Sequence, residues 1–217
     1  MQIILYRTFS APGGPPLNVT VIATDSNSLK VSWQAPHAQL RNGIIKGYNI
    51  GYKIASSSGA YQFRVLEVPE DYTATLSLPI NDLHKFTQYS VVVQAFNAGG
   101  KGPLSKQVIA VTSESIPTKP PQDVKCSVLS SKSIHVTWQP PPLASIHGVL
   151  QGFKVIHKPI IDQMESRAPH VTTLNSTTKI TIQNLDKFTN YSILVLATTR
   201  RGDGVKSEPI FCRTFQD

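Results

Sequence analysis

Apolar and polar residues alternate along short segments throughout this chain. Leu29, Val31 and Trp33 alternate with polar residues in the first half, and Ile134 and Val136 do so in the second. Glycine, proline and asparagine separate these segments. Segments in which every second residue is apolar, separated by turn-forming residues, predict antiparallel strands with one face toward a core and the other toward solvent. In the first half we expect seven strands, at residues 17–23, 28–34, 47–54, 61–67, 74–80, 87–96 and 104–112.

The pattern occurs twice. Trp33 is matched by Trp138, an offset of 105 (138 − 33), and the segment Leu83–Tyr89 is echoed by Leu185–Tyr191, an offset of 102 (185 − 83). One structural unit of about a hundred residues is therefore repeated. Seven short alternating strands in each unit predict an all-β fold of two tandem immunoglobulin-like sandwiches.

Composition supports a globular protein and narrows its chemistry. Of 217 residues, 40% are hydrophobic and 16% are charged, and 16 prolines and 13 glycines suit many short strands. The formal charge of +8 would allow weak attraction to acidic partners such as heparan sulfate or anionic lipid. The basic residues are dispersed, however, which favours an ordinary solvated surface.

Catalytic and metal-binding patterns are missing from the sequence. The six histidines are scattered without the spacing of a metal-ligand pair, and there is no nucleophile elbow, phosphate loop or dinucleotide fingerprint. Nucleic-acid binding would need a basic stripe with interleaved aromatic residues, which the chain also lacks. We therefore expect no enzyme, no catalytic residues, no cofactor, no metal and no nucleic-acid partner.

Landmarks shared by the two copies resemble fibronectin type III domains. They are the Pro15-Pro16 start, Trp33 at the end of the second strand, Gly47-Tyr48 opening the third, and Tyr89 before the sixth, each with a counterpart in the second copy. The resemblance covers nearly the whole chain. It implies that Tyr89 and Tyr191 are tyrosine corners, with a buried ring and a hydroxyl bonded to nearby backbone.

Longer segments resemble a narrower family. Residues 42–48 (Asn-Gly-Ile-Ile-Lys-Gly-Tyr), 91–97 (Val-Val-Val-Gln-Ala-Phe-Asn) and 187–192 (Lys-Phe-Thr-Asn-Tyr-Ser) are similar to consecutive central type III domains of the Down syndrome cell adhesion molecule (Dscam) family. This resemblance implies a segment from the extracellular part of a single-pass plasma-membrane receptor that recognises copies of itself. Adhesion in that family resides mainly in immunoglobulin domains, which are missing here.

The repeat also sets the expected domain boundaries. Residues 13–114 and 115–217 form one type III domain each. Tyr6-Arg7-Thr8-Phe9 resembles Cys212-Arg213-Thr214-Phe215 at the end of the second copy. Residues 1–12 are therefore interpreted as the tail of a preceding type III domain or a linker. Three prolines within residues 113–121 predict an extended, semi-rigid connection between the domains.

Cys126 and Cys212 are the two cysteines of the chain. The repeat offsets place them at the positions of Val21 and Ala110, in the first and last strands of the domain. Both thiols are then expected to point into the sandwich near the same end, and an extracellular chain would oxidise them to a disulfide. The alternative is two buried thiols on strands too far apart to bridge.

Two kinds of surface motif remain. Asn18, Asn175 and Asn190 begin N-x-[ST] sequences, so we expect them to be glycosylation acceptors; ordinary loop chemistry is the competing interpretation. Arg201-Gly202-Asp203 lies between the sixth and seventh strands of the second domain, where fibronectin carries an integrin-binding tripeptide. The first copy has Ala98-Gly99-Gly100-Lys101-Gly102 there, of equal length, which favours a tight turn with both glycines at positive φ.

Two functions of different class follow. The favoured one is a spacer and interaction segment of a homophilic, Dscam-like receptor, with lateral contacts on one membrane. The alternative is a ligand-binding type III module that engages an integrin or proteoglycan through the Arg201–Asp203 loop and basic surface. Exposed apolar side chains on the sheets would favour the first, and a protruding basic loop would favour the second.

Overall fold

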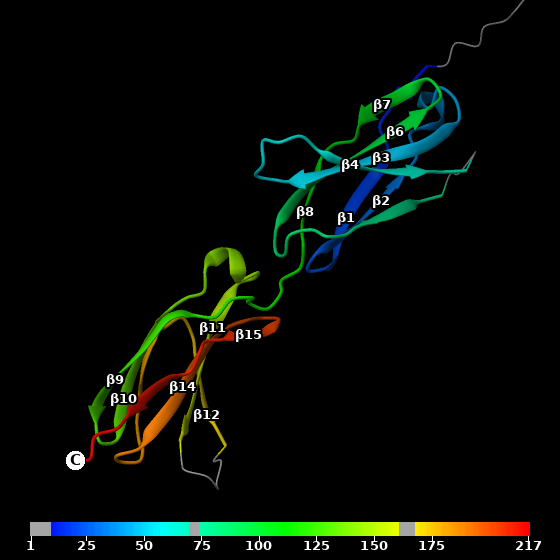
Figure 1. Cartoon of the computed structure of the whole chain (residues 1–217). Coiled ribbons are helices and arrows are strands. Elements are labelled where there is room, and N and C mark those ends of the chain that lie inside the picture. Colours follow the sequence, from blue (N-terminus) through cyan, green and yellow to red (C-terminus); the bar gives the residue numbers. More distant parts are fainter. Residues whose placement is uncertain (1–9, 70–73, 161–167) are drawn as a thin grey trace, which may run out of the picture. The chain divides into compact units, whose positions relative to one another are not determined.

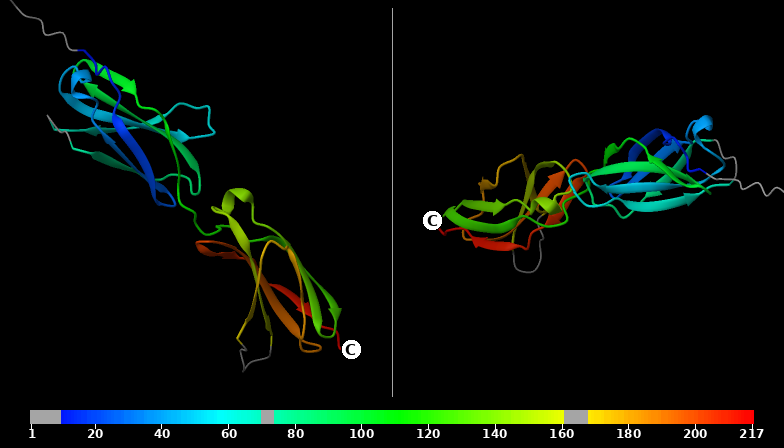
Figure 2. Two further views of the ribbon diagram at one scale, coloured as in Figure 1. Left: turned by 180° about the vertical axis from the view of Figure 1, so that it is seen from behind. Right: turned by 90° about the horizontal axis from the view of Figure 1, so that it is seen from above.

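The structure is a computed structural model that describes residues 10–69, 74–160 and 168–217 (Figure 1). The chain divides into two compact units, Met1–Ser113 and Glu114–Asp217. Each unit is a sandwich of two antiparallel sheets, which can be followed from two further directions in Figure 2. The all-β, two-sandwich prediction is therefore confirmed.

The first unit pairs a three-stranded sheet with a five-stranded one. The smaller sheet has the order β1-β2-β5, and the larger has β4-β3-β6-β7 with β8 also paired to β6. A short 3-10 turn, η1, follows β2. The elements are β1 (Leu17–Asp25), β2 (Ser28–Gln34), η1 (Ala38–Leu40), β3 (Ile45–Ile54), β4 (Gln62–Glu67), β5 (Leu76–Ile80), β6 (Gln88–Asn97), β7 (Gly100–Leu104) and β8 (Val108–Val111).

The second unit repeats this topology. Its sheets have the orders β13-β10-β9 and β12-β11-β14-β15, with β16 also paired to β14. The elements are β9 (Gln122–Ser130), β10 (Ser133–Gln139), η2 (Leu143–Ser145), β11 (Leu150–Pro159), β12 (His170–Leu174), β13 (Lys179–Ile182), β14 (Asn190–Thr199), β15 (Gly202–Lys206) and β16 (Ile210–Arg213).

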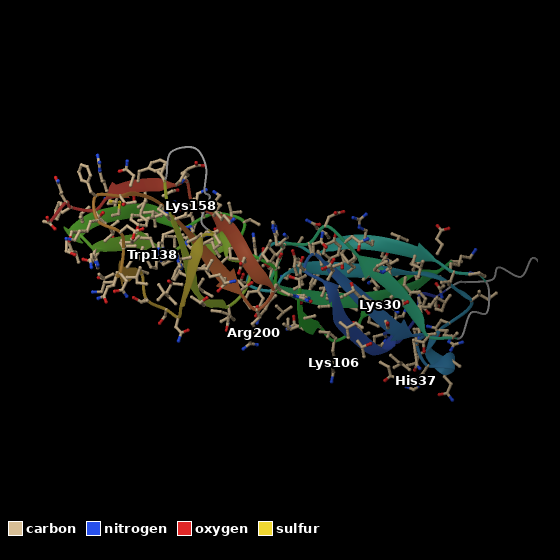
Figure 3. All side chains as sticks on the ribbon, turned by 90° about the horizontal axis from the view of Figure 1, so that it is seen from below. Lys30, His37, Lys106, Trp138, Lys158 and Arg200 are labelled. Carbon is tan, nitrogen blue, oxygen red and sulfur yellow. A yellow bond between two sulfur atoms is a disulfide. The ribbon has the colours of Figure 1, made fainter. Side chains whose placement is uncertain are left out.

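Each unit has eight strands among its described residues, and the predicted count of seven was wrong. The last strand, expected at 104–112, begins earlier, at Gly100, and is divided into β7 and β8 with Ser105 between them. The Ser105 hydroxyl accepts a hydrogen bond from the Val93 backbone N–H at 3.0 Å, and Ser207 does the same for Val195. The side chain thus replaces one rung of the backbone ladder, while the neighbouring Lys106 extends into solvent (Figure 3).

Each core is built around a tryptophan. Trp33 packs against Tyr48 with ring centroids 5.4 Å apart, and Trp138 packs against Phe153 at 5.5 Å. All four side chains are buried, and Trp138 lies inside its sandwich in Figure 3. The inward residues of both sheets supply the rest of each core, as the alternating pattern predicts. Each unit therefore has its own hydrophobic core.

The segment before β1 belongs to the first unit. The Asn97 side chain donates a hydrogen bond to the Ser10 carbonyl at 2.9 Å, and the Asn42 side chain donates one to Ala11 at 2.8 Å. In the second unit the Thr199 hydroxyl bonds to the Ser115 carbonyl in the same way. Residues 10–12, which the sequence assigned to a tail, therefore contact the first sandwich. The rest of that predicted tail, 1–9, lies outside the described residues.

Candidate functional site

The predicted disulfide is present. Cys126 of β9 and Cys212 of β16 are bonded, with their Cα atoms 6.4 Å apart. Each strand lies at the edge of a different sheet, so the bond ties the two layers together where the sandwich would otherwise be open. Both cysteines are partly buried against the second core. In the first unit Val21 and Ala110 line the core at the equivalent place.

Tyr89 and Tyr191 are buried, and their hydroxyls bond to backbone. The Tyr89 hydroxyl accepts a hydrogen bond from the N–H of His84, and the Tyr191 hydroxyl accepts one from Asp186, each at 2.8 Å. Each bond spans five residues and fixes the loop before β6 or β14. This is the arrangement that the resemblance implied for these tyrosines.

The Arg201-Gly202-Asp203 tripeptide lies in a tight hairpin between β14 and β15. Thr199 pairs with Gly202, which leaves Arg200 and Arg201 as the two residues of the tip. Both arginines are exposed, and Arg200 extends away from the sheet in Figure 3. Gly202 has φ +130°, a conformation that L side chains rarely adopt. Gly202 and Asp203 are already part of β15, so the tripeptide does not form an extended finger.

Both charges of the tripeptide have partners within the second unit. The Asp203 carboxylate binds the Lys154 ammonium of β11, with Nζ 2.8 Å from Oδ1 and 2.9 Å from Oδ2. The Arg201 Nε donates to the Glu114 carbonyl at 3.3 Å. An integrin would need an open carboxylate to coordinate its metal ion, so recognition here would require the Lys154–Asp203 pair to break.

Gly204 has a different role from the one that the turn interpretation gave it. Only Gly202 of the two has a positive φ in the left-handed region. A Cβ on Gly204 would lie 2.6 Å from the Pro117 Cβ, a separation that real side chains do not reach. The glycine is therefore needed for close packing of the segment before β9, which the Val205 N–H to Pro117 carbonyl bond also holds.

All three N-x-[ST] asparagines are exposed, on different parts of the two units. Asn18 is in β1, with φ +50°, and its amide donates to the Gln34 side chain at 2.7 Å. Asn175 follows β12. Asn190 opens β14 opposite Arg213. The Asn18 amide nitrogen, which a glycan would modify, must release Gln34 first.

His157 occupies the register of Tyr52, as expected, and is only 8% exposed. It lies directly opposite His170 on β12, and the two rings stack with centroids 5.3 Å apart. The Nδ1 atom of His157 is buried without a hydrogen-bond partner. Burial, and to a lesser extent the neighbouring His170, lowers the pKa of His157 below its ordinary value.

The larger sheet of the first unit also carries apolar side chains on its outer surface, which the sequence pattern did not predict. Gly47 and Gly51 face outward from β3, and aromatic rings from the flanking strands cover them. A Cβ on Gly47 would lie 2.5 Å from the Phe96 ring, and one on Gly51 would lie 2.7 Å from the Phe63 ring. The sequence signal for this surface is a pair of glycines on the outward face of one strand. Glycine is needed there because side chains of the neighbouring strands lie directly on the backbone.

Among residues 10–69, 74–160 and 168–217, no group of three or more His, Cys, Asp or Glu side chains is placed to hold a metal ion. Within the same residues, no helix is long and apolar enough to cross a membrane.

Fold and sequence together define the class of protein. The fibronectin type III domain family matches residues 14–111 and 119–213, which is one domain in each unit. The chain belongs to this family and consists of two type III domains.

Its relatives are cell adhesion molecules. Cell adhesion molecule Dscam2 of Drosophila melanogaster is 46% identical over 218 residues, which cover all of this chain and 10% of that protein. Cell adhesion molecule DSCAM of Rattus norvegicus is 43% identical and DSCAML1 of Homo sapiens is 38% identical, over 100% and 96% of this chain and 11% and 10% of theirs. The chain thus spans about a tenth of the length of these relatives.

Proposed function

We propose that this chain is a spacer and interaction segment in the extracellular part of a homophilic cell-adhesion receptor. The observation that carries the proposal is similarity to Dscam proteins along the whole chain, at 46% identity for the fly relative. The parent receptor would be anchored in the plasma membrane by a single span outside this segment. Its partners would be other copies of the same receptor.

Features of both units support an extracellular segment. A disulfide such as Cys126–Cys212 is typical of proteins from oxidising compartments, which include the cell exterior. The exposed acceptors Asn18, Asn175 and Asn190 could carry glycans without disturbing either core. Each unit has a complete core of its own, so the two can act as successive rigid elements of a longer extracellular chain.

Integrin or proteoglycan binding is less well supported. The Asp203 carboxylate already binds Lys154, and the tripeptide lies in a two-residue hairpin instead of a protruding loop. The +8 charge still allows weak binding of heparan sulfate, which would depend strongly on salt because it would rest on screened surface charges.

Cell mixing tests the proposed function. The full-length receptor that contains this segment is expressed in non-adherent cells. An epitope tag is inserted into the turn at residues 56–59 of the first unit. We expect antibody to label intact cells, and receptor cells to aggregate with one another but not with untransfected cells labelled in a second colour. A tag detected only after permeabilisation, or aggregates that include untransfected cells equally, would contradict the proposal.

A further inference from the structure

The larger sheet of the first unit carries large apolar residues on both faces, and on the outer face the hydrogen-bonded Asn49 and Gln94 lie among them. Its inner face lines the core. Its outer face, turned away from the three-stranded sheet, carries six large apolar residues on β4, β6, β7 and β8: Phe63, Val65, Val92, Phe96, Leu104 and Ile109. An antiparallel sheet of this kind normally presents a polar outer face to water. We call these six residues the outer apolar face.

On the outer apolar face, two aromatic rings cover the backbone of β3. Phe63 and Phe96 lie over Gly51 and Gly47, so their rings fill the spaces that side chains on β3 would occupy. Beneath them Val92 is 3% exposed although it points away from the core. Phe63, Val65 and Ile109 remain 48%, 59% and 48% exposed. A cluster of exposed large apolar residues of this kind is typical of interaction sites on soluble proteins.

Charges lie at opposite ends of one row of this sheet. Across the strands the register runs Glu67, Gly47, Phe96, Lys101, from β4 to β7. When two copies pack this face together about a two-fold axis parallel to the strands, the β4 end of each row meets the β7 end of the other. Glu67 of each copy then faces Lys101 of its partner, and the apolar residues meet in the middle.

The second unit lacks this self-complementarity, although its topology is the same. The equivalent row runs Gly152, Thr198, Asp203 from β11 to β15, so an acidic residue stands where the first unit has Lys101. The Asp203 carboxylate is already bound to Lys154 of its own sheet, so it does not supply the charge that Lys101 supplies in the first unit. In addition, Asn190, a glycan acceptor, lies on the outward-facing register of β14. None of the three acceptors is on the larger sheet of the first unit.

We propose that the outer apolar face of the first unit binds the same face of a second copy of this chain, with Glu67 paired to Lys101 across a two-fold axis. The choice of a second copy is consistent with the proposed homophilic receptor but is argued from the charge pattern. Four strands spaced at about 4.8 Å and five residues long give a face of roughly 300 Å² in projection. Two such faces bury roughly 600 Å² in total, less than the roughly 1,200–2,000 Å² of a standard specific interface, so the dimer is weak in solution and suits lateral contact between receptors held on one membrane.

Sedimentation of the whole 217-residue chain tests this inference. We expect a monomer–dimer equilibrium over a concentration series that reaches several hundred micromolar. Phe63→Glu or Val65→Glu weakens the dimer about tenfold or more by placing an unpaired charge in the contact. Two matched controls leave it unchanged: Ile22→Glu, at a 60% exposed residue of the other sheet, and Val171→Glu, at the equivalent of Phe63 in the second unit.

A charge swap tests the two-fold axis itself. Glu67→Lys and Lys101→Glu each weaken the dimer when measured alone, because like charges then face each other. The double variant recovers it, and so does an equimolar mixture of the two single variants. Circular dichroism and urea unfolding identify any variant that is misfolded. A chain that stays monomeric, or a dimer that Phe63→Glu and Lys101→Glu leave unchanged, overturns the inference. Such a result would not change the outcome of the cell-mixing test described above. Failure of this inference can therefore be distinguished from failure of the proposed function.

Discussion

Lys154 of β11 and Asp203 of β15 form an ion pair across the second unit, with 2.8 Å between Nζ and Oδ1. Asp203 is the acidic residue of the only Arg-Gly-Asp tripeptide in the sequence. Because it is bound to Lys154, its side chain is held against the sheet and does not project from an extended loop. A tripeptide that integrins bind in one type III domain can therefore be part of an ordinary hairpin in another.

We expect cells not to attach to the immobilised chain through Asp203. Asp203→Glu and Asp203→Ala should leave cell attachment at the level of the unaltered chain, and chelation of divalent cations should have no effect. Lys154→Met is the informative companion, because it releases the carboxylate while keeping the length of the side chain. Attachment that requires divalent metal and disappears in Asp203→Glu would show that the tripeptide is an integrin site.

The disulfide should stabilise the second unit alone. Replacing Cys126 with Val and Cys212 with Ala copies Val21 and Ala110 of the first unit, so packing is conserved while the cross-link is lost. The bond closes a loop with a sequence separation of 86 residues, and the chain-entropy model gives about 4 kcal/mol for a loop of that size. Urea unfolding followed by Trp138 fluorescence, in a Trp33→Phe background, measures the change. A second unit that unfolds at the same urea concentration with and without the bond would contradict this expectation.

Each tyrosine hydroxyl should stabilise only its own unit. Tyr191→Phe removes the acceptor of the Asp186 N–H and should lower the free energy of unfolding of the second unit by about 1 kcal/mol. Tyr89→Phe should do the same to the first unit through His84. The two variants are each other's control, since each should leave the other transition in place. Equal shifts in both transitions from one substitution would rule out independent corners.

His157 should make the second unit less stable in acid. Its pKa is lowered in the folded state, chiefly by burial, from an ordinary value of 6.5. Below pH 6.5 the unfolded chain therefore binds more protons than the folded one, and the free energy of unfolding falls as the pH drops through that window. One such group changes the stability by at most about 1.4 kcal/mol per pH unit. Unfolding at a series of pH values between 7.5 and 5 measures it.

The matched control for this pH dependence is His157→Tyr, which installs the residue that the first unit carries at the same register, Tyr52. The variant should lose most of the pH dependence between these values. A second unit whose unfolding follows pH equally in both proteins would assign the effect to other groups.

Sequence periodicity predicted the fold well because each sandwich depends on which residues face inward. Leu29, Val31 and Trp33 alternate strictly, and all three are completely buried. The division of the last strand at Ser105 was not predictable in this way. It depends on a side-chain hydroxyl that replaces a backbone bond to Val93, and alternation does not report such a substitution.

The functional surface was harder to predict than the core. The disulfide followed from the repeat, because equivalent positions in two copies of one fold lie at equivalent places. The outer apolar face did not, because Phe63 and Phe96 alternate with core residues and resemble ordinary strand residues in a linear sequence. Their role depends on Gly51 and Gly47 of a neighbouring strand, which only the register brings beneath them. The Lys154–Asp203 pair likewise joins residues 49 positions apart.

Cell aggregation with an altered parent receptor tests the central claim most directly. Three full-length receptors are compared: the unaltered one, one that lacks these two domains, and one in which two unrelated type III domains replace them. A spacer and interaction segment predicts strong aggregation for the first, a clear loss for the deletion, and partial recovery for the replacement, which restores length but not the outer apolar face. Aggregation that is unchanged by the deletion, at equal surface expression, would contradict the account.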